Sequence, residues 1–518
     1  MPERYDVVVV GGGHNGLVCA AYLARSGLRV AVLERRSVVG GACVTEEIFP
    51  GYKVCTAAQI GGLLKTKVIR DLGLEQFGFE LAPFDPHRLH LFPDGRYIQY
   101  WREPAKSMAE VAKFSGKDAQ AYLRFEQQMD RLASIMKPSL ELRPPLPVGE
   151  VEARFAEAGE SRAFREIMFG SMKGFLDARF ESEEVKASIA PRGMTGVGMG
   201  PMSAGSAYMM LHYWPEPGTA WGRVPGGMGT ITQALASAAR SLGAEVYTDA
   251  EVVSIRVTGG RATGVELADG RIMEAKAVAS NADPKRTFQR LVEPGDLDAD
   301  FLTQVDGIAG EGMTFNIHFA MSGLPEFKAF PGEGAGSQHQ GLFWIAPSVE
   351  YLERAWDDAK YGHPAKGPYL SGIIHSAMDP SMAPPGKHYM TVYGQWAPYR
   401  LKEGDWASIG DGYVKHCVDL MTQYIPNLPE IIDDYFLVSP KELEDRVYMS
   451  QGHMFHGECV PGQLFRHRPF SGWADYRTPI KDLYMCGAGT HPGGTVTGAP
   501  GHNAAHEILK DWREGAVG

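Results

Sequence analysis

Residues 5–34 read YDVVVVGGGHNGLVCAAYLARSGLRVAVLE, and this stretch predicts the architecture of the whole chain. An apolar, β-branched run at Tyr5–Val10 stops at a glycine-rich turn. A helical pattern follows over 17–26, and a second apolar run, 29–33, ends on Glu34. Strand, glycine turn, helix, strand and acid in this order are typical of the first βαβ unit of a dinucleotide-binding domain.

The residues of the turn have separate roles in such a unit. Gly11 allows the tight turn, Gly13 lets a pyrophosphate approach the backbone, and Gly16 lets the helix pack closely on the strand. The start of the helix presents free N–H groups and a partial positive charge, so His14 and Asn15 are candidate phosphate contacts. A glycine turn without a nucleotide is the alternative, and the complete motif favours the nucleotide.

The residues after the second strand indicate which dinucleotide binds. Glu34 is placed to accept hydrogen bonds from both ribose hydroxyls and would repel a 2′-phosphate, and Arg35 beside it is a further candidate contact. Gly40, Gly41 and Ala42 follow, and a glycine pair here lets the chain run beside the pyrophosphate and the ribityl chain. NAD-binding units do not need that contact, so the pair favours FAD over an ordinary loop.

The length and the net charge of the chain limit its domain organisation and its binding partners. A chain of 518 residues exceeds one simple core and indicates two interleaved domains. The net charge of −11 argues against nucleic acid and against a broadly anionic membrane surface. No run of about eighteen apolar residues occurs, so we expect no spanning helix. The first strand begins almost at the first residue, which leaves no room for a targeting peptide.

Six cysteines occur without a CxxC pair and without Cys/His metal spacing. We therefore expect a reducing, cytoplasmic location, no metal site and no disulphide-reductase chemistry. Cys43 is expected to be a buried filler rather than a redox thiol. Peripheral contact with a membrane would need an amphipathic patch in the inserted helices, and no basic cluster marks one.

The middle of the chain departs from the nucleotide-binding pattern. Residues 88–92 and 96–101 alternate in polarity across Asp94-Gly95 and predict a β-hairpin. Two helical stretches follow, 107–136 and 151–189, as expected of a substrate domain. The Met-rich segment 207–214 would suit the wall of an apolar ligand site, or plain core.

The chain then returns to the nucleotide domain. A helix over 230–242 leads into strands at 245–247 and 251–257, and in two-dinucleotide flavoproteins a backbone edge here, Val252 and Val253, pairs with the adenine. A meander, 262–267 and 271–274, and a further short strand at 277–281 end on Asn281, another candidate contact.

The C-terminal motif completes the predicted cofactor site. A strand entering a glycine turn, 483–489, is followed by a helix to about Trp512. The start of that helix is able to point at the flavin pyrimidine, where negative charge builds up on reduction. The candidate contacts here are Gly489, Thr490, Thr497 and Gly498.

The alternation between nucleotide-binding segments and other segments predicts an α/β chain in five pieces. FAD-binding pieces at 1–80, 221–300 and 475–518 alternate with substrate-domain pieces at 81–220, which includes a helical insert, and 301–474. Strands near 313–321, 369–375 and 388–395 and a helix over 411–425 are expected in the last of these pieces.

Three blocks of sequence resemble the phytoene desaturase and carotenoid isomerase superfamily of FAD proteins. They are VGGGHNGL at 10–17, PGGMG at 225–229 with SNADP at 280–284, and GAGTHPGG at 487–494. The branch named pyridine nucleotide-disulphide oxidoreductase domain-containing protein 2 is the most similar, through ERR at 34–36, GGACVTEE at 40–47 and QGHMFHGE at 451–458. The resemblance spans essentially the whole chain.

The resemblance implies a glutathione-reductase-type Rossmann FAD-binding domain with an interleaved α+β substrate domain. It also implies non-covalent FAD, a hydrophobic substrate tunnel ending at the flavin, carotenoid-like polyene substrates and a homodimer. Two departures matter. Amine oxidases carry an acid near the position of His491, which argues against amine oxidation. The disulphide chemistry in the branch name finds no support in these cysteines.

Candidate catalytic groups cluster in one short block. His453, His456 and Glu458 lie together between glycines, and His212 and His491 are second candidates. The alternative is that these histidines are hydrogen-bonded parts of the structure. No Ser/His/Asp order and no metal-ligand spacing appears.

Three functions remain open at this stage. The first is an FAD-dependent oxidoreductase, a desaturase or dehydrogenase acting on an apolar, polyene-like or lipid-like substrate, with oxygen or a quinone as acceptor. The second is non-redox isomerisation of a polyene on reduced FAD. The third is a flavin-bearing binding or scaffold protein without turnover. We predict the first.

Overall fold

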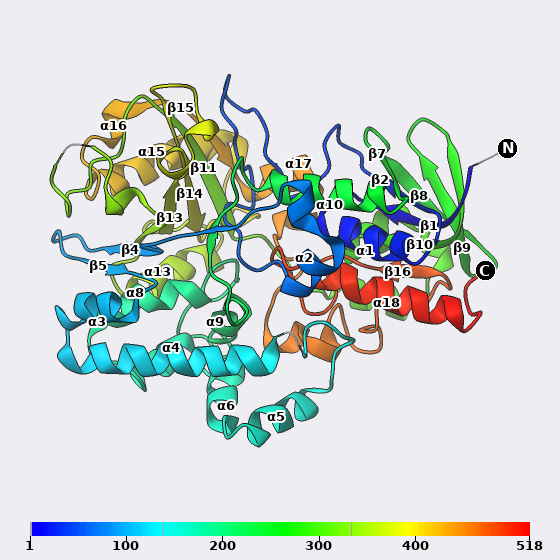
Figure 1. The fold of residues 1–518 in the computed structure, drawn as a ribbon, viewed down its shortest axis with the longest axis horizontal. Coiled ribbons are helices and arrows are strands. Elements are labelled where there is room, and N and C mark those ends of the chain that lie inside the picture. The colour runs from blue at the N-terminus through cyan, green and yellow to red at the C-terminus, as the bar shows by residue number, and fades with distance from the viewer. Residues whose placement is uncertain (1–2, 138, 333) are drawn as a thin grey trace.

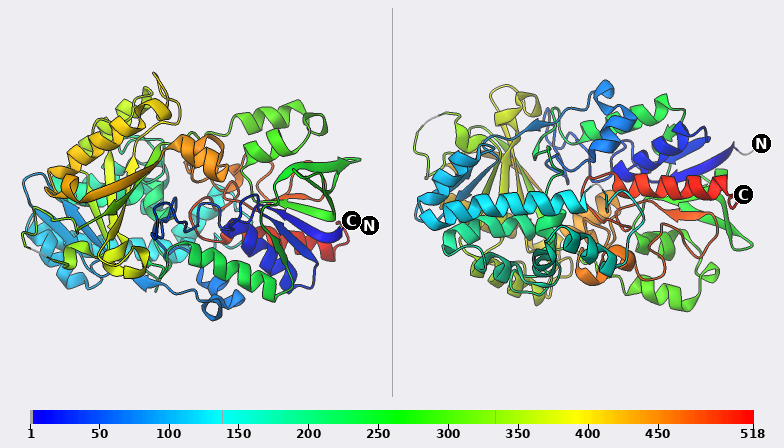
Figure 2. Two further views of the ribbon diagram at one scale, coloured as in Figure 1. Left: turned by 90° about the horizontal axis from the view of Figure 1, so that it is seen from above. Right: turned by 60° about the horizontal axis from the view of Figure 1, so that its bottom comes forward.

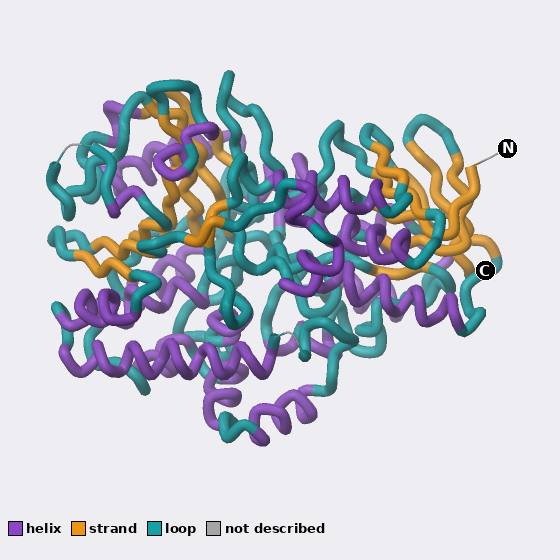
Figure 3. Tube along the Cα trace, viewed as in Figure 1, coloured by secondary structure: helices purple, strands orange, loops and turns teal. Residues whose placement is uncertain are grey.

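The computed structural model describes residues 3–137, 139–332 and 334–518. Residues 1, 2, 138 and 333, which fall within the predicted segments 1–80, 81–220 and 301–474, lie outside the described residues. The molecule is elongated, with one β-sheet toward each end and helices packed around both (Figures 1 and 3). Both ends of the chain lie beside the first of these sheets (Figure 1).

The first sheet combines strands from the beginning, the middle and the end of the chain. Its order is β7-β2-β1-β10-β9-β8, and β16 also pairs with β10. The pairs among β7, β2, β1, β10 and β16 are parallel, whereas β9 and β8 continue as an antiparallel meander. The strands are β1 Glu3–Val10, β2 Val30–Leu33, β7 Glu245–Tyr247, β8 Val252–Thr258, β9 Arg261–Leu267, β10 Ile272–Ser280 and β16 Leu483–Met485. This is the predicted Rossmann layout.

One strand of this sheet differs from the prediction. The sequence predicts two short strands, 271–274 and 277–281, whereas β10 runs without a break from Ile272 to Ser280. It stays continuous because it pairs with β1 in register over its length, from Glu3 with Met273 to Val10 with Ser280. A local sequence pattern does not reveal pairing between strands that lie so far apart in the sequence.

Three helices cover one face of the first sheet: α1 His14–Arg25, α10 Gly229–Ser241 and α18 Ala499–Arg513. Helix α1 lies between the other two and contacts both. Figure 2 shows α18, in red, alongside α1, in blue. Their close approach depends on Gly501, where a Cβ atom would lie 2.0 Å from the Asn15 carbonyl oxygen.

The second sheet combines strands from the predicted substrate-domain pieces, 81–220 and 301–474. Its order is β15-β11-β14-β13-β12-β4-β5. The predicted hairpin forms β4 and β5, while β12 and β15 are strands that the sequence analysis missed. The bounds are β4 Arg88–Leu91, β5 Tyr97–Tyr100, β11 Thr314–Met321, β12 Leu342–Ile345, β13 Tyr369–Ile374, β14 His388–Gln395 and β15 Ile432–Val438.

The two faces of this sheet have different chemistry. Side chains alternate across a strand, so residues two apart share a face. Phe315, Leu370 and Val392 belong to an apolar core that packs against α15 Trp406–Thr422. The opposite face carries polar side chains, Asn316 and Tyr393 among them, which are direct partners in the pairing of β11 with β14. This face looks toward the first sheet.

The inserted helices are more broken than the sequence suggests. The stretch 107–136 forms α3 Pro104–Ala112 and α4 Gly116–Met136, because the Ser115 hydroxyl accepts a hydrogen bond from the Asp118 N–H and starts a new helix. Serine caps at Ser171 and Ser182 similarly divide 151–189. The pieces are α5 Val148–Glu157, α6 Ser161–Phe169, α7 Met172–Asp177 and α8 Glu183–Ile189.

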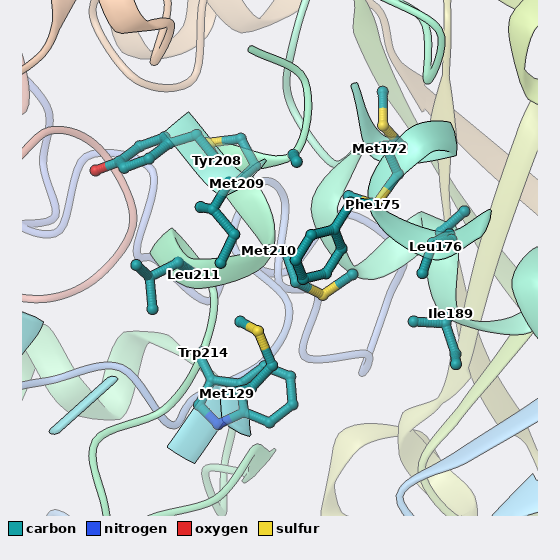
Figure 4. Packing of buried hydrophobic residues seen from close by; sticks show 14 of the residues in the cluster. Met129, Met172, Phe175, Leu176, Ile189, Tyr208, Met209, Met210, Leu211 and Trp214 are labelled. Atoms are coloured by element: carbon teal, nitrogen blue, oxygen red, sulfur yellow. The ribbon is translucent and has the colours of Figure 1, made fainter. Parts of the chain in front are cut away.

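The Met-rich segment belongs to the core. It forms α9 Tyr208–His212, where Met209 and Met210 are 1% exposed. Figure 4 shows them packed among side chains of α4, α7 and α8, including Met129 and Phe175. Apolar packing therefore accounts for its composition, as in the second of the two interpretations.

The remaining elements connect these layers. They are β3 Ala82–Pro83, β6 Gly222–Arg223, α2 Thr66–Leu72, α11 Pro284–Arg286, α12 Ala299–Asp306, α13 Val349–Lys360, α14 His375–Met378, α16 Leu428–Ile431 and α17 Pro440–Val447. Across the described ranges, none of the helices combines the length and the apolar character needed to cross a membrane.

Candidate functional site

A cavity of about 390 Å³ lies between the two sheets. One part, here called the nucleotide end, is lined by β1, the start of α1, the end of β2 and the start of β8. The other part, called the far end, is lined by residues of β11 and β14 and of two loops: Ala57, Ala58, Thr314, Asn316, Tyr393, Met454 and Phe455.

Most of the predicted cofactor contacts line the nucleotide end. They are Gly11, Gly13, His14, Asn15, Glu34, Arg35, Gly40, Gly41, Ala42, Val252, Val253 and Asn281. Gly16 lies behind this wall, where a Cβ atom would come within 2.2 Å of the Gly11 carbonyl oxygen. Its place is the contact between helix and strand that the motif predicts.

The nucleotide end has the features that a dinucleotide needs. A Cβ atom on Gly13 would lie 2.8 Å from Asn281 Nδ2, so a larger residue here would displace the Asn281 side chain. Asn15 Oδ1 and His14 Nε2 are buried and have no hydrogen-bond partner among the described residues. Both residues stand in the first turn of α1, where the backbone favours anions.

Glu34 is held firmly at the end of β2. Its Oε2 accepts a hydrogen bond from the Gly12 N–H at 3.0 Å, and its Oε1 accepts one from the Arg36 N–H at 2.9 Å. Burial raises the pKa of the carboxyl, while these two backbone donors act in the opposite direction. The side chain is thus fixed where a ribose would lie.

A segment far along the chain closes over the nucleotide end. Tyr448 lines the cavity with its ring between two guanidinium groups, 3.5 Å from Arg35 and 4.0 Å from Arg286. Its hydroxyl donates to Glu251 Oε1 at 3.2 Å. The sequence analysis missed Tyr448, because no local motif surrounds it.

The predicted C-terminal contacts do not themselves line the cavity. Gly489, Thr490, Thr497 and Gly498 are not among the described lining residues, whereas their neighbours Ala488, Thr495 and Val496 are. The Thr490 hydroxyl donates to the Gly487 carbonyl at 2.9 Å, and Thr497 Oγ1 accepts from the Ala499 N–H at 3.2 Å. These side chains shape the turn and start α18 rather than facing the cavity.

The far end carries polar but uncharged groups. The Tyr393 hydroxyl donates to Gln395 Oε1 at 2.5 Å and accepts from the Gly196 N–H at 2.9 Å. Asn316 Oδ1 accepts from Gln59 Nε2 at 2.7 Å. The sequence analysis missed both lining residues, because the register of β11 with β14 decides which of their side chains share a face.

The candidate catalytic block divides into two parts. His453 Nδ1 accepts hydrogen bonds from the Phe455 and Gly457 N–H groups, and its Nε2 lies 3.2 Å from Glu458 Oε1. Glu458 also accepts from the Gly198 N–H at 3.0 Å. Neither His453 nor Glu458 lines the cavity, so the geometry gives this pair a role in holding loops together.

His456 does line the cavity. Its backbone is left-handed, with φ +57°, and its Nδ1 is buried without a hydrogen-bond partner among the described residues. Burial lowers the pKa of the imidazole to about 4. His212 and His491 lie outside the lining and bond to backbone oxygens, of Gly494 at 3.1 Å and of Leu140 at 2.9 Å.

Arg468 fixes the loop that carries His456. Its guanidinium is 1% exposed and donates to the carbonyl oxygens of Phe455 and Gly457, on either side of His456, at 2.5 and 3.2 Å. It also reaches the Ala488 carbonyl at 2.7 Å and thereby joins this loop to the C-terminal turn. No motif predicted it.

Comparison with known proteins identifies the family to which this chain belongs. The profile of the family described as flavin containing amine oxidoreductase matches residues 16–509. A mouse protein named pyridine nucleotide-disulfide oxidoreductase domain-containing protein 2 is 35% identical, over 99% of this chain and 94% of its own length. A limonene dehydrogenase component from Castellaniella defragrans is 28% identical, over 98% and 95%. A lycopene-forming phytoene desaturase from Paracoccus is 24% identical, over 96% of each chain. The predicted superfamily and branch are confirmed.

Solved structures confirm the fold. A putrescine oxidase variant superposes with a TM-score of 0.61 over 99% of this chain and 100% of its own, at 15% identity. With the family match and the cradle formed by Gly13, Asn15 and Glu34, FAD is the cofactor of this chain.

Proposed function

The chain belongs to the family of flavin containing amine oxidoreductases, and on that premise we propose that it is an FAD-dependent desaturase or dehydrogenase of an uncharged, apolar substrate of the polyene or lipid class. The flavin-dependent redox chemistry follows from the family. The substrate class is the proposal, and the composition of the far end carries it.

The described lining of the far end lacks a countercharge for a charged substrate. Amines reach an enzyme as ammonium ions, and burying such a charge without a paired carboxylate costs free energy. Among the described lining residues of the far end there is no carboxylate and no cation, and Asn316, Thr314 and Tyr393 offer only neutral hydrogen-bonding groups. Ala57, Met454 and Phe455 supply apolar surface beside them.

In this proposal the residues of the chain position the substrate and do not react with it themselves. Bound FAD supplies the acceptor for hydrogen removed from carbon. Met454 and Phe455 exclude water from the far end, while Tyr393 is held rigid by Gln395. His456 is the histidine that this loop turns toward the cavity, and burial keeps its ring neutral at neutral pH. The catalytic roles of His453, His456, Glu458 and His212 remain predictions.

Two relatives support the apolar substrate class by name, one a component of a limonene dehydrogenase and one a phytoene desaturase. Peripheral contact with a membrane and a homodimer would suit such a substrate, and both remain proposals.

The test is an anaerobic reductive titration of the purified full chain, followed by its flavin absorption. The panel consists of limonene, phytoene and a long-chain unsaturated alcohol, with putrescine and a monoamine as the matched charged set. Bleaching by an apolar compound and not by the amines is expected. Bleaching by amines alone would overturn the proposal. Turnover of a polyene only after reduction of the flavin would instead indicate isomerisation, and a flavin inert to the whole panel and reducible only chemically would indicate a binding protein.

A further inference from the structure

Two histidines from distant parts of the chain face the same cavity. His14 is the first residue of α1, and His456 lies in the loop after α17, yet both line the cavity. They are close enough for a charge on His456 to lower the pKa of His14. His456 also packs against the C-terminal turn, where a Cβ on Gly489 would lie 3.6 Å from its own Cβ.

Each ring has one nitrogen that the described residues leave unused. His14 Nε2 and His456 Nδ1 are both buried and have no hydrogen-bond partner among the described residues, and the same holds for Thr495 Oγ1 beside them. A buried polar atom without a partner costs free energy, so such a group in a cavity indicates a ligand that completes it. Asn15 Oδ1, in the same helical turn as His14, is a further unpartnered atom.

Both rings are neutral around pH 7 in the protein as described. The pKa of His14 is lowered to about 4, first by burial and then by His456, against the effect of a backbone hydrogen bond to Thr495. The pKa of His456 is lowered to about 4 by burial, opposed by Asp283 and reinforced by Arg468 and His453. A neutral imidazole donates through only one of its nitrogens.

We propose that His14 and His456 act as one proton-linked pair in cofactor binding, taking up a proton from solvent when the pyrophosphate of FAD enters the cavity. The pyrophosphate brings negative charge to the N-terminus of α1, and an anion nearby favours the charged form of an imidazole. The pair gains one proton rather than two, because two adjacent imidazolium ions would repel each other.

The structure keeps His456 at this place despite a strained backbone. A left-handed conformation is uncommon for a residue other than glycine, and it persists where neighbouring contacts hold it. Arg468 donates to the carbonyl oxygens on both sides of His456, and the His456 N–H donates to the His453 carbonyl at 3.1 Å. Arg468 is therefore a positioning residue for the pair.

The direction of the pH effect follows from the charges around the pair. Because the pair has a higher pKa with FAD bound than without it, affinity rises as the pH falls through the bound value and levels off below about 4. Arg286, Arg290 and Asp283 line the cavity as well. Glu34 has a raised pKa, but its protonation would remove a ribose acceptor and weaken binding at low pH, the opposite trend. The other charged residues lining the nucleotide end are Arg35, Arg36 and Glu251.

The experiment measures proton uptake directly. Full chain from which FAD has been removed is titrated with FAD by calorimetry at pH 6.5, in two buffers with different ionisation enthalpies, and the dissociation constant is followed from pH 6 to pH 8. We expect a net proton uptake and a dissociation constant that falls by up to about tenfold for each pH unit by which the pH is lowered. Wild-type protein that takes up no proton would overturn the proposal without any variant.

Matched substitutions assign the proton to the pair. His14→Gln places an amide nitrogen near the position of Nε2, and His456→Asn places one near Nδ1 and tolerates the left-handed backbone. The double variant should bind FAD with a pH-independent affinity and no proton uptake. His502→Gln is the control, because His502 is a buried histidine of α18 whose Nε2 also lacks a partner among the described residues, whose pKa is also about 4, and which does not line the cavity. This control should behave as wild type.

Unchanged proton uptake in the double variant would overturn the assignment. The proposal depends on FAD binding and not on the substrate. A chain that takes up the proton with FAD but is never reduced by apolar compounds would contradict only the proposed function.

Discussion

At the nucleotide end of the cavity the walls carry charges, Glu34, Arg35 and Arg286 among them, whereas the far end is lined by Asn316, Tyr393 and Phe455 without a charge in the described lining. The first surface comes from the ends of the parallel strands β1 and β2 and from the start of the antiparallel strand β8 in one sheet, and the second from the polar face of another. The difference separates two tasks. Fixed charges and backbone dipoles suit an anionic cofactor, whereas an uncharged surface suits the apolar substrate that we propose.

The largest expected effect tests the nucleotide end alone. Gly16→Ala places a Cβ 2.2 Å from the Gly11 carbonyl oxygen, so α1 must move away from β1 and the phosphate-binding turn is distorted. We expect FAD to bind at least about a hundredfold more weakly, which is about 3 kcal/mol, as measured by calorimetry. Gly412→Ala, in an exposed part of α15 with open space around its Cβ, is the control and should raise the free energy of unfolding by up to about 1 kcal/mol. Equal FAD affinity in both variants would contradict the prediction.

The next prediction concerns a substitution that should affect both ends of the cavity. Arg468→Leu leaves the carbonyl oxygens of Phe455, Gly457 and Ala488 without this donor in a buried place. The free energy of unfolding should fall by about 3 kcal/mol or more, measured by urea denaturation. FAD affinity should fall as well, because His456 loses its position. Arg468→Lys should recover part of the stability, and a fully stable leucine variant would show that the loop is held by other contacts.

A smaller effect is confined to the ribose contact. Glu34→Ala removes the acceptor at the end of β2, and FAD should bind between about tenfold and about a hundredfold more weakly, the value of one or two hydrogen bonds to a charged group. Glu34→Gln keeps one acceptor oxygen and should lose less. If the glutamine variant were the weaker binder, the Gly12 and Arg36 contacts would matter more than the ribose.

The smallest effect should leave cofactor binding untouched. Tyr393→Phe removes the hydroxyl that donates to Gln395, while the Gly196 N–H keeps its bond to Gln395 Oε1 at 2.7 Å. We expect the free energy of unfolding to fall by about 1 kcal/mol and the FAD dissociation constant to change less than about twofold. A large loss of FAD would show that the two ends are coupled, which would break the comparison.

The block at 453–458 shows where sequence reasoning stopped. The pattern QGHMFHGE marked three titratable residues as equals. In the structure His456 lines the cavity with a left-handed backbone, whereas His453 Nε2 lies 3.2 Å from Glu458 Oε1 and neither of those two residues lines the cavity. Arg468, which fixes that conformation through carbonyl oxygens, lies beyond the motif. Every residue has a backbone carbonyl, so the identities of the bonded residues do not reveal such hydrogen bonds.

The sequence by itself determined the part of the nucleotide end that the first βαβ unit forms. A contiguous βαβ unit specifies its turn, its helix start and its acid through local backbone geometry, so Gly11, Gly13, Asn15 and Glu34 could be placed from spacing alone. Only the tertiary structure decided the far end and the pairing of His14 with His456. Asn316 and Tyr393 meet because β11 and β14 pair in one register, and register is fixed by the packing of whole strands rather than by any short pattern.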